Sequence, residues 1–238
     1  MDPEAMLEFL GHLRFPLAKS GHKLSARRFR LYAVAVCRRV WSLLTDETLR
    51  TAVETAEKYA DGNATEEELA AVYSDAETVV SKVLATALSP LLSATNPQPT
   101  SREAGIPANA ASAAWATLRV TAFDAARHAA QFACLAASGS GVGERTRSHS
   151  ERLAQAHLLR DIFGTPWRRP STVDLASNYS IAKMAGDICD ARSFERLPGL
   201  AAALEEAGCA DAELLAHLRS EGPHVRGCWA LDAVLGLE

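Results

Sequence analysis

Apolar residues recur every three or four positions along nearly the whole chain. This spacing places them on one face of an α-helix, and stretches of alternating apolar and polar residues, which are typical of strands, are missing. The clearest example is residues 24–44, where five apolar side chains share one stripe: Phe29, Tyr32, Val36, Val40 and Leu43. We therefore predict an all-α protein, a compact multi-helix bundle or array of about nine or ten helices with no sheet.

Capping residues and helix breakers divide this pattern into segments. Pro3 lies in the first turn of a helix that is expected to end before Pro16, and Asp46 begins a later helix. After a turn at residues 61–63, a longer helix leads to Pro90, which is expected to kink or end it. Further helices are predicted over residues 109–137, 151–163, 174–191, 198–207, 211–220 and 224–235.

Two polar segments interrupt the helical pattern. Residues 93–108 carry three prolines among mostly polar residues, and we interpret them as a linker or a long surface loop. Residues 138–150 are rich in glycine and serine, and we interpret them as a flexible loop. The chain, residues 1–238, is expected to form a single helical domain, with the alternative of two subdomains, 1–95 and 107–238, joined by the proline-rich loop.

The composition is that of an ordinary globular protein, with 48% hydrophobic and 23% charged residues and a formal net charge of −4. The negative charge argues against a dedicated nucleic-acid-binding protein, because affinity for the phosphate backbone comes from clustered Lys and Arg. No apolar run has the length of a membrane span, and the N-terminal residues lack the layout of a signal peptide. The five cysteines are odd in number and scattered, unlike a secreted disulfide framework. We therefore expect a cytoplasmic protein with no membrane partner.

Four stretches of the chain carry a resemblance to a known family: DPEAMLEFL, RRFRLYAVAVCRRVWSLLTDETLRTAVETAEKYADG, QAHLLRDIFGTPWRR and LPGLAAALEEAGCADAELLAHLRSEGPHVRGCWALDAVLG. They are similar to a large uncharacterised family of helical bacterial proteins that is abundant in planctomycete-type genomes. The similarity extends over nearly the whole chain, so it implies one evolutionary unit with a helical fold. It implies no particular activity, cofactor or catalytic residue.

Groups able to ligate a metal crowd together in the last thirty residues of the sequence. Two cysteines and two histidines lie there: Cys209, His217, His224 and Cys228. Zinc takes four such ligands in a tetrahedral array, and His224 and Cys228 are spaced by one helical turn, so both can face one ion. The compact C-x-x-C pairs of zinc fingers do not occur. The simpler interpretation is that the cysteines are buried thiols and that the histidines cap or end helices.

A second candidate surface is basic. Four arginines on the helix predicted over residues 24–44 align in two pairs, at about 100° of rotation per residue: Arg27 with Arg38, and Arg28 with Arg39. They suit a phosphate or nucleic-acid backbone, or else they pair with carboxylates of the following helices, which the negative net charge favours. A smaller group with the composition of interface residues is formed by Trp167, Arg168 and Arg169.

Motifs of common enzyme classes are missing: the sequence contains no H-E-x-x-H, no G-x-S-x-G and no glycine-rich phosphate loop after a strand. We therefore expect a non-enzymatic helical module that binds or scaffolds another protein, with no catalytic residue and no cofactor. The first alternative is a zinc-binding module or an enzyme that uses the C-terminal Cys/His cluster. The second is weak nucleic-acid binding through the arginines of the second helix.

Overall fold

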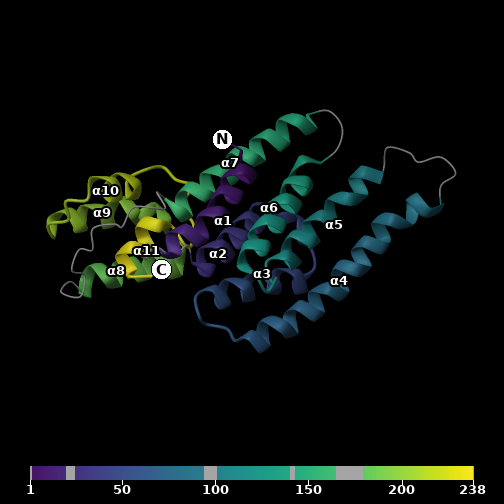
Figure 1. Cartoon of the computed structure of the whole chain (residues 1–238), viewed down its shortest axis with the longest axis horizontal. Helices are drawn as coiled ribbons and strands as arrows, with labels where there is room; N and C mark the ends of the chain where they lie inside the picture. Colours follow the sequence, from purple (N-terminus) through teal and green to yellow (C-terminus); the bar gives the residue numbers. More distant parts are fainter. Residues whose placement is uncertain (1, 20–24, 94–100, 140–142, 165–178, 238) are drawn as a thin grey trace. The chain divides into compact units, whose positions relative to one another are not determined.

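The computed structural model describes residues 2–19, 25–93, 101–139, 143–164 and 179–237. Within these ranges the chain forms α-helices and two short 3-10 helices, and no strand (Figure 1). The prediction of an all-α fold is therefore confirmed. In the same part of the chain, no helix combines the length and the apolar character needed to cross a membrane.

The chain divides into two compact units. Unit 1 comprises Met1–Leu13 and Ser25–Ala156, and unit 2 comprises Arg14–Leu24 and His157–Glu238. Helix α1 (Pro3–Lys19) and helix α7 (Glu144–Phe163) each contribute residues to both units. Residues 101–108 of the predicted proline-rich loop lie within unit 1, and residues 94–100 of it lie outside the described residues.

Five further helices belong to unit 1: α2 (Ala26–Arg39), α3 (Glu47–Ala60), α4 (Glu66–Ser93), α5 (Ser101–Ala116) and α6 (Ala122–Ser138). Helix α6 packs against α5 and α2, and α4 packs along α5 and α3 (Figure 1). The buried positions of α6 are almost all alanine. Small side chains let helix axes approach closely, so α6 can contact two neighbours at once.

Helix α2 is buried on every side over residues 29–37. Phe29, Tyr32, Val36 and Val40 of the predicted stripe are all buried. The predicted cap of α3 is also confirmed, because the Asp46 carboxylate accepts a hydrogen bond from the Thr48 N–H at 2.8 Å.

Three prolines lie inside helices, although the sequence predicted loops or helix ends near them. Pro16 lies within α1, Pro90 within α4 and Pro107 within α5. The predictions that the first helix ends before Pro16 and that residues 101–108 form a loop are therefore wrong. A proline removes one intrahelical hydrogen bond, and packing can offset that loss; α5 is packed by both α4 and α6.

The single helix predicted over residues 109–137 is also wrong, because the structure breaks it into α5 and α6. The buried guanidinium of Arg30 donates hydrogen bonds to carbonyls in the break: Thr117 at 2.6 Å, Arg119 at 2.9 Å and Val120 at 3.3 Å. Thr121 then caps α6 by accepting the Asp124 N–H. Arg30 comes from a distant part of the sequence, so no local pattern indicates this break.

Among the described residues of unit 2, four α-helices follow α7: α8 (Tyr179–Ala191), α9 (Leu197–Glu206), α10 (Ala212–Leu218) and α11 (Trp229–Leu235). Helix α8 packs against α9 and α11, and α10 packs against α9 and α11. Their shared apolar core includes Ile188, Leu200, Leu204, Leu218 and Leu231.

Two further predictions in this part of the chain need correction. Residues 144–150, which were expected to be flexible, form the first two turns of α7. Residues 224–228, which were expected to be helical, form a loop before α11. The loop results from positive backbone φ angles at Gly222 and Gly227, both +92°, which a regular helix does not allow.

Candidate metal centre

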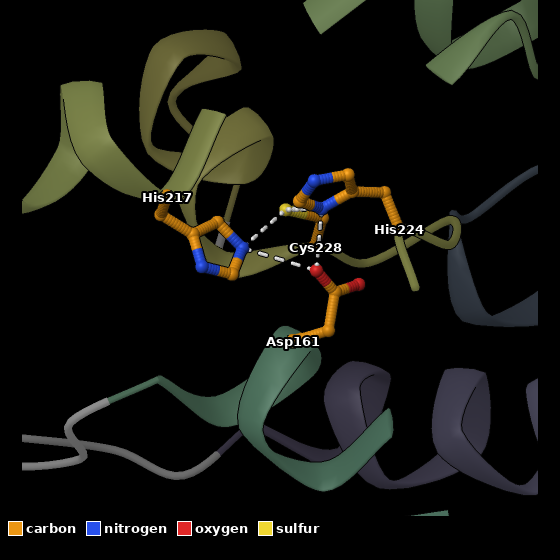
Figure 2. Close-up of side chains that lie close together, drawn as sticks. All are labelled: Asp161, His217, His224 and Cys228. Carbon is orange, nitrogen blue, oxygen red and sulfur yellow. Dashed lines mark hydrogen bonds and ion pairs between the residues drawn. The ribbon is translucent and has the colours of Figure 1, made fainter. Parts of the chain in front are cut away.

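Four side chains able to bind a metal converge within unit 2: Asp161, His217, His224 and Cys228 (Figure 2). One ligand atom of each lies within 4.8 Å of those of the other three. The residues come from the last turn of α7, from α10, and from the loop that leads into α11. The structure thus brings together three of the four predicted metal ligands and adds a carboxylate.

The fourth predicted ligand, Cys209, is not a member of this group. It follows α9 and is buried in the apolar core of unit 2, where its N–H donates a hydrogen bond to the Leu204 carbonyl at 2.9 Å. The interpretation of Cys209 as a small buried thiol describes this environment. Asp161 takes the fourth position. The spacing of cysteines and histidines could not indicate it, because it lies 56 residues before His217.

The four ligand atoms form a compact group. Asp161 Oδ1 lies 3.0 Å from His217 Nε2 and 2.9 Å from His224 Nδ1. Cys228 Sγ lies 3.2 Å from His217 Nε2 and 3.9 Å from His224 Nδ1. Around a tetrahedral zinc ion with bond lengths of about 2.0–2.3 Å, nitrogen and oxygen ligands are about 3.3 Å apart, and nitrogen and sulfur ligands about 3.6 Å apart. Both nitrogen–oxygen separations are shorter than the tetrahedral value, and the two nitrogen–sulfur separations lie on either side of theirs.

The use of the ring nitrogens distinguishes this group from a Cys-His-Asp catalytic triad. In a triad, the histidine directs one ring nitrogen toward the nucleophile and the other toward the acid. Here the same atom, His217 Nε2, lies close to both Cys228 Sγ and Asp161 Oδ1 (Figure 2). Convergence of several donor atoms on one point is the arrangement of metal ligands.

The backbone orients the ring of His224. Its Nε2 lies 3.1 Å from the Ser220 carbonyl oxygen, and a carbonyl only accepts, so Nε2 carries a proton. In the neutral ring, Nδ1 then presents a lone pair to Asp161 Oδ1 at 2.9 Å. Such an approach is repulsive unless a cation, either a second proton or a metal ion, lies at Nδ1. Histidines that bind metals commonly donate their other N–H to a carbonyl in this way.

Asp161 is held by its second oxygen. The Val225 N–H donates to Asp161 Oδ2 at 3.0 Å, which leaves Oδ1 directed toward the two histidines. The Asp161 side chain is only 3% exposed. A carboxylate at this depth requires partners that compensate its charge.

The group also shifts the pKa values of its members. Burial raises the pKa of Asp161, but hydrogen bonds from His217 and His224 outweigh burial, and the pKa lies below its ordinary value. Burial lowers the pKa of His224, but Asp161 outweighs burial and the pKa lies above its ordinary value. Burial and the charge of Asp161 both raise the pKa of the Cys228 thiol. A divalent cation among these groups would favour the thiolate instead.

Two glycines permit the close packing around the group. Gly164 follows α7 with φ +54°, and a Cβ atom there would lie 2.7 Å from Trp229 Cγ. The Trp229 ring in turn lies 5.0 Å from the ring of His217, measured between centroids. Gly222 has φ +92°, and a Cβ atom there would lie 2.7 Å from the backbone nitrogen of His224. A larger residue at either position would displace a segment that carries a ligand.

Arg27, Arg38 and Arg39 of the predicted basic surface form ion pairs within unit 1. Ion pairs join Arg27 to Asp61 at 2.9 Å, Arg38 to Glu57 at 3.0 Å, and Arg39 to Glu151 at 2.8 Å. This geometry is that of the alternative interpretation, in which the arginines pair with carboxylates, although Glu151 belongs to α7 and not to the next helices. Arg28 donates its backbone N–H to the Ser25 hydroxyl that caps α2. Trp167, Arg168 and Arg169 lie outside the described residues.

Unit 1 contains a polar cleft lined by residues of α1, α5, α6 and α7. Its charged lining residues are balanced in sign: Arg127, Arg145 and Arg152 against Asp2, Glu4 and Glu144. This balance indicates no class of ligand.

Comparison with known protein families, with curated proteins and with solved structures finds no match. The proposal for function is therefore built on the geometry of the metal-ligand group.

Proposed function

We propose that unit 2 is a zinc-binding helical module in which Asp161, His217, His224 and Cys228 hold one structural zinc ion. The observation that supports this proposal is the convergence of four ligand atoms from three separate parts of the unit. Helix packing alone does not require a carboxylate, two imidazoles and a thiol to share one point.

The chemistry of the ligands favours zinc. Two imidazole nitrogens, one thiolate and one carboxylate oxygen are all common zinc ligands, and the mixed set suits a tetrahedral ion of borderline softness. The thiolate and the carboxylate together neutralise a divalent cation. Neutrality matters here because Cys228 is fully buried and Asp161 is nearly so.

A structural role follows from the number of ligands. Catalytic zinc sites have three protein ligands and leave a position for water or substrate, whereas structural sites are closed by four. With four ligands available in this group, the protein itself completes the tetrahedron. The zinc would join the end of α7 to α10 and to the loop before α11.

A role in binding or scaffolding another protein stays a prediction from the sequence, and it is compatible with a zinc-stabilised module. Nucleic-acid binding through the second helix is less well supported, because Arg27, Arg38 and Arg39 are in ion pairs with carboxylates.

Titration of the tag-free protein with Co²⁺, which reports its coordination by colour, tests the proposal. We expect one equivalent to bind, with the intense visible bands of tetrahedral Co²⁺ and a thiolate-to-cobalt charge-transfer band in the near ultraviolet. The Cys228→Ser variant should lose the charge-transfer band. The Cys209→Ala variant should keep it, because this buried thiol lies outside the group. Weak octahedral bands, or a charge-transfer band that survives in Cys228→Ser, would refute the proposed site.

A further inference from the structure

We infer that metal occupancy gates the loop of residues 219–228, which connects α10 to α11: when the metal leaves, the loop opens and exposes the Cys228 thiol, while the apolar core of unit 2 stays folded. This inference rests on the proposed zinc site and assigns it a regulatory consequence. It concerns one loop and one thiol, and not the folding of the whole unit.

Two sets of contacts hold this loop: contacts with the metal-ligand group, and two ion pairs, Arg219 with Glu205 and Arg226 with Asp190. The Val225 N–H binds Asp161, and His224 binds both Asp161 and the Ser220 carbonyl. Residues 219–223 are exposed to solvent. Segments that are solvent-exposed and have few apolar contacts open most readily. Glu205 and Asp190 are exposed, and exposed ion pairs contribute little. The position of the loop therefore depends mainly on its contacts with the metal-ligand group.

Unlike the loop, the helices on both sides of it, α10 and α11, are stabilised by apolar packing. Leu218, the last residue of α10, is fully buried, as are Leu200 and Leu204 of α9. On the other side, α11 buries Trp229, Leu231 and Val234. Cys228 belongs to this apolar core, and Trp229 contacts the ring of His217. The leucines and valine pack mainly on one another, so their packing is expected to persist when the metal is removed.

Cys228 lies between the loop, which the metal-ligand group holds, and α11, which apolar packing holds. Its side chain is fully buried, and Figure 2 shows its sulfur directed toward His217 and His224. Cys228 is also a member of the apolar core of unit 2, so exposure of its thiol requires the loop residues before it, including His224, to move away. Opening the loop therefore converts a buried thiol into an accessible one.

The other cysteines provide internal controls. Cys134 in unit 1 is partly exposed, so it should react in every state. The remaining three are buried, one in unit 1 and two in the core of unit 2: Cys37, Cys189 and Cys209. The labelling pattern thus separates opening of the loop from unfolding of either unit.

The test is alkylation of the tag-free protein with iodoacetamide, with one equivalent of zinc or after treatment with EDTA, followed by mass spectrometry of the peptides and by measurement of bound zinc. We expect Cys134 to be labelled in both states and the three buried controls in neither. The labelling rate of Cys228 should rise by at least about tenfold after EDTA, as expected when the metal no longer stabilises the closed loop.

Coordination alone can protect a thiolate, so hydrogen exchange provides a second measurement. Amides of residues 219–227 should exchange faster after EDTA, whereas amides of α9 should be unchanged. The Asp161→Ala variant should show the fast pattern even with zinc present, and Asp187→Ala, which removes an exposed carboxylate of α8, should behave as the wild type.

Each other outcome overturns the inference. If zinc is bound but the exchange of residues 219–227 does not change, the zinc site stands and the gate is refuted. If Cys189 and Cys209 also become labelled after EDTA, the whole unit unfolds and the opening is not local. If no zinc binds, both the proposed function and the gate fall, and the zinc measurement identifies this case.

Discussion

Asp161 is the residue on which the candidate site most depends. It lies in the sequence LLRDIF, and its neighbours Leu158, Leu159 and Ile162 are buried. A carboxylate among buried apolar residues requires compensating partners, and here they are two imidazoles and one backbone N–H. A polar residue on the buried face of a helix is thus the signal by which Asp161 could have been recognised in the sequence.

Removing one ligand should weaken zinc binding strongly. We expect Asp161→Asn and His217→Gln each to lower zinc affinity by about 100-fold or more, since even groups that only support a ligand contribute about 10–100-fold. Competition with a chromophoric chelator measures the change. Exposed residues of the same types in unit 2 serve as controls, and Asp187→Asn and His157→Gln should bind zinc as the wild type does. Equal affinity in ligand and control variants would refute the assignment.

The pH dependence of stability should differ between the metal-free and the zinc-bound protein. The pKa of Asp161 is lowered from 3.8, so its stabilisation is present above that value and is lost as the pH falls further. The pKa of His224 is raised from 6.5, so its stabilisation is complete below 6.5 and is lost as the pH rises through the raised value. The metal-free protein should therefore be most stable between about pH 3.8 and pH 6.5, the ordinary pKa values of the two groups. Its free energy of unfolding should decrease toward alkaline pH.

Zinc should reverse this trend, because its ligands must lose protons to bind it. Urea denaturation with EDTA and with zinc, from about pH 5.5 to about pH 8, measures both trends. We expect the difference in unfolding free energy between the two series to grow with pH. A constant difference would mean that zinc does not bind through these residues.

Three of the four residues in the group were predictable by type and by their proximity in the sequence. His217, His224 and Cys228 lie within a short C-terminal segment. Cys209 lies in the same segment, and only the tertiary fold separates it from the others. Spacing identifies residues that are able to meet, but packing decides which of them do.

At the scale of helices, apolar periodicity predicted where helices form better than where they end. The ends depend on distant partners, as the break between α5 and α6 shows. Arg30 binds three carbonyls there and also stacks over the Tyr59 ring, 5.1 Å from its centroid. Such contacts leave no mark in the local sequence.

Replacing Arg30 should therefore destabilise unit 1. We expect Arg30→Met to lower the free energy of unfolding by about 2–4 kcal/mol, because it leaves carbonyls at the end of α5 without their donor. Chemical denaturation measures the loss. The exposed Arg127→Met is the matched control and should change stability by less than about 0.5 kcal/mol. A similar loss in both variants would show that the contacts of Arg30 are unimportant.

In unit 2, the glycine that follows α7, Gly164, should also be sensitive to substitution. Gly164→Ala should destabilise the protein by about 1–3 kcal/mol, because the new methyl group would meet the Trp229 ring. It should also weaken zinc binding, since Asp161 lies one turn before Gly164. Gly186→Ala, where a Cβ atom meets nothing within 4 Å, should instead stabilise α8 by about 0.5–1 kcal/mol. Denaturation and zinc competition on both variants test this, and a neutral Gly164→Ala would contradict the packing.

At the scale of the whole molecule, the all-α class followed from a pattern that repeats along the entire chain. The periodicity does not indicate the boundary between the two units, which falls after Leu13, before Ser25 and after Ala156. Helices α1 and α7 contribute to both units. A division that falls within helices is set by tertiary packing and not by loop composition.

The central claim is that the fold of unit 2 builds one closed zinc site. X-ray absorption at the zinc edge, together with elemental analysis of the tag-free protein after incubation with zinc and removal of excess metal, tests it most directly. We expect one zinc per chain, with one sulfur at about 2.3 Å and three nitrogen or oxygen ligands at about 2.0–2.2 Å. Less than about a tenth of an equivalent of zinc, or a coordination shell without sulfur, would contradict the account.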